Sequence, residues 1–256
     1  MEESIRLAGS LGLKVSVGFE DATRADLGFL TDMALFAEEA GAVRVRLADT
    51  VGIASPTNIA SLVAGLGSEL SSCEIAIHTH NDFGMATANA VAGLEAGAVW
   101  ADSTILGLGE RAGCSKLEEL VGFLSLTCGD STLHPEHLRS LAGYVAGITG
   151  RSVSGTQPLL GEDIFTCETG LHLQGLQSDP KTYEPYSPQR VGAKRKLLFG
   201  AKSGRKAVTQ LLYGEGEASI SQPIKVSQIE AIRLFAREVG RSLDKEEMLA
   251  CISSGE

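Results

Sequence analysis

Apolar residues follow two alternating spacings through the first half of the chain. KVSVGFED is a short β-rich run, and the next segment places Leu27, Leu30, Met33 and Phe36 at helical spacing before Gly41, a helix-stop residue. The runs VRVRLADT, EIAIHTHND and WADSTILGLGE are each followed by another helical segment. Four strand–helix units, each near the ~30 residues of such a unit, predict a parallel α/β sheet.

Local signals mark the start of two of these helices. Ser55 followed by Pro56 fits an N-cap and a first helical position. Ser115 with Glu118 three residues on matches a capping box. We therefore expect helices to begin directly after Ser55 and after Ser115.

Polar residues stand where each predicted strand ends. Glu20 follows the first strand and Thr50 the second, His78 and His80 close the third, and Arg111 follows the fourth. The carboxyl ends of parallel strands share one edge, where TIM barrels and open α/β sheets build their active sites. No G-x-G-x-x-G turn follows the first strand, so a nucleotide-binding sheet is disfavoured.

The pair His78 and His80 has two interpretations. Side chains at positions i and i+2 of a strand share a face, so the two imidazoles would converge at the strand end. They would either ligate a metal or cap the strand by hydrogen bonding. Asn81 and Asp82 follow directly, which favours the metal. Imidazole and carboxylate ligands suit a divalent ion that acts as a Lewis acid on a carbonyl substrate.

Composition excludes several classes of partner. The 256 residues carry a formal net charge of -10 and have a pI near 5.1, which argues against a nucleic-acid partner. No apolar run approaches the ~20 residues of a membrane helix, and the N-terminus lacks a signal-peptide layout. Five scattered cysteines without a CxxC pair suit a reducing compartment. We therefore expect a cytoplasmic protein.

The segment HTHNDFGMATANAVAGLEAGA and, after it, GLGERAGCSKLEELV resemble the acyl-CoA-condensing metallo-aldolase family. That family includes 2-isopropylmalate, citramalate and homocitrate synthases, and HMG-CoA lyase belongs to the same barrel superfamily. The resemblance extends through FEDATRAD, ADTVG and GEDIFTCETGLHLQGL to the SGR after Lys202. The later segments are most similar to homocitrate synthase of the nitrogen-fixation type.

The resemblance implies a role for residues at matched positions. They are His78, His80 and Cys114 for the metal, Thr50 and Arg111 for the substrate, and Glu20, His172 and Tyr183 for catalysis. It also implies a divalent metal (Mg²⁺, Mn²⁺ or Zn²⁺) and acetyl-CoA as co-substrate. The implied reaction adds the acetyl-CoA enolate to a 2-oxo acid, with 2-oxoglutarate giving homocitrate as the expected case and 2-isopropylmalate or citramalate synthesis as alternatives.

Several of these residues have structural alternatives. Glu20 fits a salt bridge at the sheet edge, and Thr50 fits a plain strand end. His172 and Tyr183, which the resemblance places in a linker that reaches the active site of a neighbouring subunit, also fit packing roles. Cys114 stands where the family has asparagine, and a thiolate there would shift metal preference toward zinc.

Further departures from the family concern the linker. Cys167 and Lys202 stand where the family has histidines, which leaves the contribution of this region open.

The expected organisation is the second half of a TIM (β/α)8 barrel over residues 1–128, small α/β linker subdomains over 129–206, and a helical tail over 207–256. The family's opening strand, with its Arg-Asp pair, has no counterpart, and four strands cannot close a barrel. Three interpretations follow: one half of a split enzyme with a separate N-terminal half-barrel subunit, a truncated enzyme, or a non-catalytic regulatory or assembly partner. The resemblance also implies an oligomer that forms through the linker region.

Overall fold

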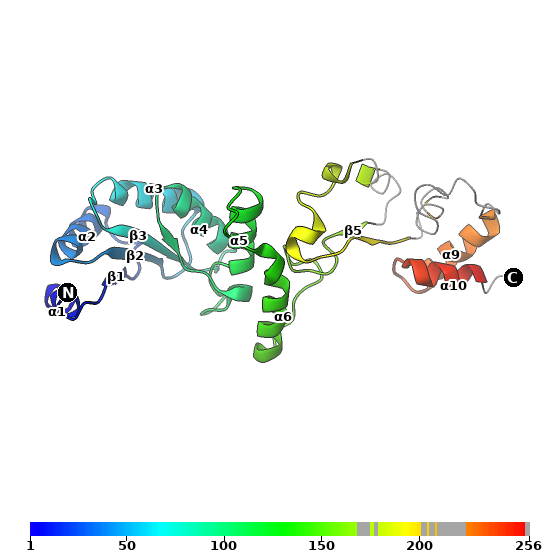
Figure 1. Ribbon diagram of the computed structural model, residues 1–256, viewed down its shortest axis with the longest axis horizontal. Coiled ribbons are helices and arrows are strands. Elements are labelled where there is room, and N and C mark those ends of the chain that lie inside the picture. Colours follow the sequence, from blue (N-terminus) through cyan, green and yellow to red (C-terminus); the bar gives the residue numbers. More distant parts are fainter. Residues whose placement is uncertain (168–174, 177–178, 201–203, 205–207, 209–223, 254–256) are drawn as a thin grey trace. The chain divides into compact units, whose positions relative to one another are not determined.

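Parallel strands alternate with helices through the first part of the chain (Figure 1). The computed structural model describes residues 1–256 except 168–174, 177–178, 201–203, 205–207, 209–223 and 254–256. Its contacts divide the chain into two compact units, one of residues 1–134 and 141–151 and one of residues 135–140 and 152–256. Each unit is described by itself.

The first unit holds, among the described residues, a parallel sheet of four strands. They are β1 (Ser16–Phe19), β2 (Arg44–Asp49), β3 (Glu74–Thr79) and β4 (Trp100–Ala101), hydrogen-bonded in that order. The helices of this unit are α1 (Glu2–Ser10), α2 (Leu27–Ala40), α3 (Pro56–Gly67), α4 (Ala86–Glu95), the 3-10 turn η1 (Ile105–Gly107), α5 (Leu117–Leu126) and most of α6 (Leu138–Thr149). The predicted parallel α/β sheet is confirmed.

The two faces of the sheet differ in chemistry. Figure 1 shows α2, α3 and α4 along one side of the sheet. Val45 and Leu47 pair in register with Ile75 and Ile77, and all four side chains are buried in the core. The alternate positions face the other way, because successive strand residues point to opposite faces. That second face carries Arg46, and the candidate site lies on it.

Of the two helix starts predicted, after Ser55 and after Ser115, the structure has the first. Ser55 caps α3 by accepting a hydrogen bond from the Asn58 backbone N–H, and Pro56 is the first helical residue, as predicted. The capping box expected at Ser115 is wrong, because α5 begins at Leu117 with Lys116 as its N-cap. Ser115 is buried instead.

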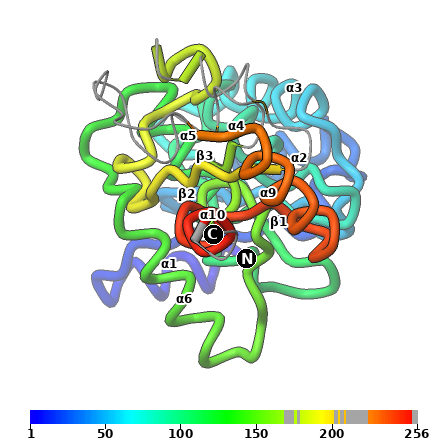
Figure 2. Tube along the Cα trace, turned by 90° about the vertical axis from the view of Figure 1, so that its right-hand side faces the viewer, coloured from blue at the N-terminus to red at the C-terminus, as the bar shows by residue number. Residues whose placement is uncertain are grey.

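The second unit has a core of its own. It contains η2 (Pro135–His137), β5 (Thr166–Cys167), η3 (Pro180–Thr182), η4 (Pro188–Val191), β6 (Lys196–Leu197), α9 (Val226–Glu238) and α10 (Lys245–Ser253), and β5 pairs with β6 in parallel. Helices α9 and α10 pack against each other, orange and red in Figure 2. Phe199 and Leu243 form an antiparallel bridge and lie in one cluster with Cys167 and Met248.

Described residues of the helical tail therefore share a core with described residues of the linker region. The division into linker and tail stays a prediction. No helix within the described ranges is long and apolar enough to cross a membrane.

Candidate active site

The two histidines of HTH lie on one face of β3 and its extension. Their ring centroids are 4.8 Å apart, and the rings are nearly perpendicular at 86°. Thr79, between them, points the other way and donates to the Ala86 carbonyl at 2.8 Å. The convergence predicted from the i, i+2 spacing is therefore present.

The Nδ1 atoms of both rings have defined partners. His80 Nδ1 lies 3.1 Å from the Asp49 main-chain carbonyl, and His78 Nδ1 lies 3.0 Å from Asp102 Oδ2. A carbonyl or carboxylate oxygen only accepts, so each Nδ1 donates. In the neutral rings the lone pair is then on Nε2, which is the arrangement of metal-binding histidines whose other nitrogen is held by an oxygen.

Asp102 and Arg46 form a polar group that the sequence patterns did not identify. Arg46 Nε donates to Asp102 Oδ2 at 2.5 Å, and a second Arg46 nitrogen lies 3.7 Å from Glu20 Oε1. The hydrogen bond from His78, and then that from Arg46, hold the pKa of Asp102 at about 2. Asp102 is therefore a carboxylate at neutral pH. Its position directly after the strand run WA was the available signal.

Glu20 and Thr50, predicted at neighbouring strand ends, are in contact. The Thr50 hydroxyl donates to Glu20 Oε2 at 2.9 Å and accepts from the Asp21 backbone N–H at 2.7 Å. Asp21 has a left-handed backbone (φ 57), which turns the chain after β1. The Glu20 side chain is exposed, so its carboxylate remains accessible to a substrate.

Arg111 is held by a carboxylate from the loop after β3. Its guanidinium makes two hydrogen bonds of 2.8 Å to Asp82 and one of 2.9 Å to the Thr50 carbonyl. The guanidinium lowers the pKa of Asp82, and the carboxylate raises that of Arg111. Gly52 makes this approach possible, because a Cβ there would collide with the Asp82 side chain.

Cys114 is placed by its backbone beside His80, with which it forms an antiparallel bridge. Its buried Sγ lies 3.1 Å from the Thr104 hydroxyl and 3.4 Å from the Leu108 carbonyl. Among the described residues, no three His, Cys, Asp or Glu side chains are grouped to hold a metal ion. The donor set present is therefore the two imidazoles, which fit a divalent cation, and a metal role for Cys114 stays a prediction.

The linker candidates belong to the second unit. Tyr183 follows η3, is half-exposed and packs beside Gly175, where a Cβ would meet its ring. His172 and Lys202 lie outside the described residues. Cys167 is buried in β5.

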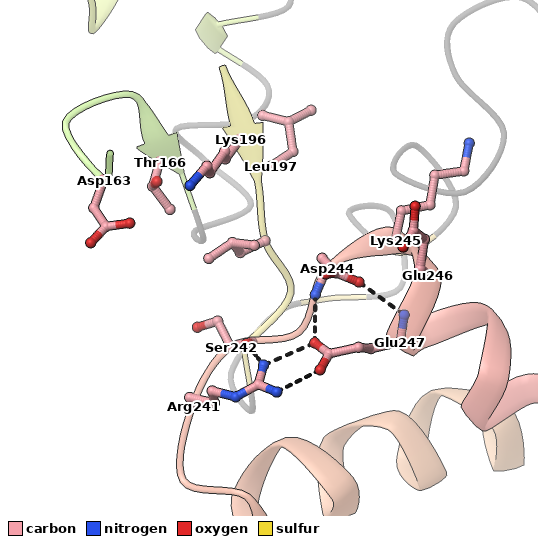
Figure 3. Close-up of a pocket in the computed structure, with 11 residues that line it drawn as sticks. Asp163, Thr166, Lys196, Leu197, Arg241, Ser242, Asp244, Lys245, Glu246 and Glu247 are labelled. Atoms are coloured by element: carbon pink, nitrogen blue, oxygen red, sulfur yellow. Dashed lines mark hydrogen bonds and ion pairs between the residues drawn. The ribbon is translucent and has the colours of Figure 1, made fainter. Parts of the chain in front are cut away.

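An open pocket of about 780 Å³ lies in the second unit (Figure 3). Three of its charged residues are in ion pairs: Arg241 pairs with Glu247, and Lys196 lies 3.3 Å from Glu162. Both acidic and basic side chains line the pocket, so the lining favours no single class of ligand.

Two family models match the chain. Residues 1–145 match the model described as HMGL-like. The chain belongs to the HMGL-like family. Residues 159–226 match a second model, described as homocitrate synthase post-HMGL domain-like.

Individual relatives agree with the family. Homocitrate synthase 1 of Nostoc sp. is 42% identical over 250 residues, covering 97% of this chain and 66% of that protein. 2-Isopropylmalate synthase 2 of Caldanaerobacter subterraneus is 38% identical over 256 residues, covering 97% of this chain and 65% of that protein. The chain thus spans slightly less than two thirds of each relative.

A solved structure supports the fold. The HMG-CoA lyase of Bacillus subtilis superposes with a TM-score of 0.54 at 21% identity, covering 59% of this chain and 55% of that one. The four strand–helix units are therefore part of a TIM-barrel fold, as the resemblance implied, and the histidine pair lies at the edge where such barrels build active sites.

Proposed function

We propose that this chain carries the histidine pair and the acid of an enzyme that condenses acetyl-CoA with a 2-oxo acid, and that the oxo acid is 2-oxoglutarate, giving homocitrate. The observation that carries the proposal is the pair His78 and His80, whose Nδ1 atoms are both held by oxygens, so that the Nε2 atoms are the candidate ligands. The match of residues 159–226 to the homocitrate synthase post-HMGL model supports the choice of oxo acid.

The Nε2 atoms of His78 and His80 would hold a divalent cation that supplies a Lewis acid for the carbonyl of the oxo acid. Glu20 is an exposed carboxylate at this edge, and it takes the proton from the methyl group of acetyl-CoA. The Thr50 hydroxyl orients that carboxylate through its 2.9 Å hydrogen bond. The resulting enolate carbon bonds to the keto carbon while the C=O π electrons move to the keto oxygen, which takes up a proton to become the hydroxyl group. Water then breaks the thioester C–S bond, which leaves a carboxylate and releases CoA as a thiol.

The complete barrel of the proposed enzyme contains more strands than the four described. Within the described part of the chain β1 and β4 are the outer strands of the sheet, whereas a TIM barrel closes with eight. The remaining strands come from another stretch of the same polypeptide or from a partner subunit. His172 and Tyr183 of the linker complete the site of a neighbouring copy, which makes the enzyme an oligomer.

2-Isopropylmalate synthesis is the second candidate function. It is favoured by the relative from Caldanaerobacter subterraneus, which aligns with 97% of this chain. The two reactions share the histidines and the acid and differ in the oxo acid, so a substrate panel separates them. Citramalate synthesis, with pyruvate, is tested in the same panel.

The test is acetyl-CoA-dependent thiol release with 2-oxoglutarate, 2-oxoisovalerate or pyruvate, each with Mg²⁺, Mn²⁺ and Zn²⁺. It is run on the chain alone and on the chain co-expressed with the product of the neighbouring upstream reading frame. We expect release with 2-oxoglutarate in the co-expressed sample, abolished by His78→Ala. Release only with 2-oxoisovalerate would reassign the substrate, and no release from any sample would favour a non-catalytic partner.

A further inference from the structure

One oxygen of Asp102 is shared by two donors. Asp102 Oδ2 accepts from His78 Nδ1 at 3.0 Å and from Arg46 Nε at 2.5 Å. A carboxylate has no hydrogen to donate, so both nitrogens must be the donors in these two hydrogen bonds. His78 is thereby fixed in the form with hydrogen on Nδ1.

Arg46 prevents the carboxylate from turning away. It lies on β2 two residues before Ala48, which is the register partner of His78, so its side chain projects from the same face of the sheet as that ring. The side chains of Arg46 and His78 are 29% and 21% exposed, so both are shielded from competing water. The Arg46–Asp102 contact spans β2 and the end of β4 and ties the carboxylate to the sheet rather than to a loop.

The two histidines are oriented by different kinds of group. His80 donates to the main-chain carbonyl of Asp49, which no side-chain substitution removes. His78 depends on a side chain, Asp102. A substitution at Asp102 should therefore disturb one ring and leave the other as an internal reference.

We propose that Asp102, clamped by Arg46, is a positioning residue that fixes the tautomer and ring orientation of His78, so that its Nε2 is presented beside that of His80 to a divalent cation. The inference rests on the metal role given to the pair under the proposed function. Oxygen partners of this kind orient metal-binding imidazoles, and removing one typically weakens metal affinity by about 10- to 100-fold.

The first test needs neither metal nor activity. Imidazole nitrogens of the ¹⁵N-labelled full chain are assigned with His78→Ala and His80→Ala, and the tautomer of each ring is read from its nitrogen chemical shifts. We expect both rings to carry hydrogen on Nδ1. Asp102→Leu, which removes the acceptor at similar size, should release His78 from this form and leave His80 unchanged.

A conservative variant separates positioning from a general structural role. Asp102→Asn keeps an oxygen that can accept from both donors, so His78 should retain hydrogen on Nδ1. Asp32→Leu makes the same change on the exposed face of α2 and should leave both rings unaltered. If His78 keeps its tautomer in Asp102→Leu, or carries hydrogen on Nε2 in the unaltered chain, the inference is overturned.

The second test measures Zn²⁺ affinity by calorimetry. Asp102→Leu should weaken binding by about 10- to 100-fold, and Asp102→Asn by less. Equal affinity in Asp102→Leu would overturn the positioning role while leaving the metal role of the pair intact. Zn²⁺ binding that survives both His78→Ala and His80→Ala would instead overturn the metal role in the proposed function.

Discussion

The guanidinium of Arg111 faces the carboxylate of Asp82 through two hydrogen bonds of 2.8 Å, and donates a third, of 2.9 Å, to the Thr50 carbonyl. One side chain thus ties the loops after β2, β3 and β4 together at the carboxyl edge of the sheet. Arg111 was expected to bind the substrate. In the structure the Asp82 carboxylate is already hydrogen-bonded to this guanidinium, so a substrate carboxylate that bound Arg111 would compete with Asp82.

Asp82→Asn should strengthen binding of a small carboxylate at this edge. The amide keeps the shape of the side chain but removes the negative charge that competes for Arg111. Oxalate titrated into the full chain by calorimetry measures the change. Glu110→Gln is the matched control, because Glu110 lies 3.7 Å from the guanidinium and is highly exposed. Weaker oxalate binding in Asp82→Asn would show that Asp82 orients Arg111 for the ligand instead of competing with it.

Glu20→Gln should lower turnover of the completed enzyme by about 10²- to 10⁴-fold, the usual contribution of a general acid or base. Thr50→Val removes the hydroxyl that donates to Glu20 and should give a smaller loss, whereas Thr50→Ser keeps the hydroxyl and should stay near the unaltered rate. Steady-state thiol release checks the series. A Glu20→Gln enzyme with full turnover would restrict Glu20 to a salt-bridge role with Arg46.

Strand positions and the edge of the site follow from local patterns. Alternating and helical spacings depend only on residues that are close in the sequence. The four strands and the shared face of His78 and His80 could therefore be predicted. The Arg46–Asp102 contact could not, because it joins positions 56 residues apart. The alternation VRVR puts Arg46 on a face of β2 but does not specify its partner across the sheet.

The misplaced start of α5 has a tertiary cause. Ser115 and Glu118 have capping-box spacing, yet both side chains are buried. Glu118 accepts a hydrogen bond from the Leu106 backbone N–H at 3.0 Å, so it holds the turn η1 instead of the Ser115 backbone. Leu106 has φ 58, a strained conformation for leucine that this contact helps to hold.

Ile77→Ala should destabilise the first unit by about 2–5 kcal/mol, because it leaves a cavity in a core that is otherwise filled. Ile77 is 1% exposed and packs so closely on Gly93 that a Cβ there would collide with it. Urea unfolding followed by the fluorescence of Trp100, the single tryptophan, reports on this unit. Ile53→Ala, at a half-exposed position, should stay within about 0.5 kcal/mol. Equal losses in both variants would contradict the packing described.

Cys128 should be the thiol that reacts rapidly in the native chain, since it is exposed whereas Cys73, Cys114 and Cys167 are buried. Burial, with Glu38 and Glu74 nearby, raises the pKa of Cys73 to about 11, so little thiolate forms there near neutral pH. Ellman's reagent at mildly alkaline pH should show one fast thiol, lost in Cys128→Ser, and the remainder on unfolding. A fast phase that persists in Cys128→Ser would mean that the partly buried Cys251 or a buried thiol reacts.

The ion pair of Arg241 and Glu247 should make the second unit sensitive to acid. The Arg241 hydrogen bonds, and then the backbone N–H of Asp244, lower the pKa of Glu247 from 4.5 to about 2 (Figure 3). A lowered folded-state pKa means that the carboxylate stabilises the fold above pH 4.5, and that this contribution fades as the pH falls toward 2. Helix α10 begins beside this pair and should loosen over that interval.

The measurement is urea unfolding of α10, followed by its amide NMR signals at several pH values from about 6 down to about 2. Glu247→Gln should be less stable than the unaltered chain at the upper end, and the difference should vanish at the lower end, because protonation removes the same charge that the substitution removes. Glu246→Gln, at a neighbouring exposed carboxylate, is the control and should track the unaltered chain throughout, because Arg241 pairs with Glu247. A stability difference that is independent of pH would show that the Glu247 side chain acts through packing and not through its charge.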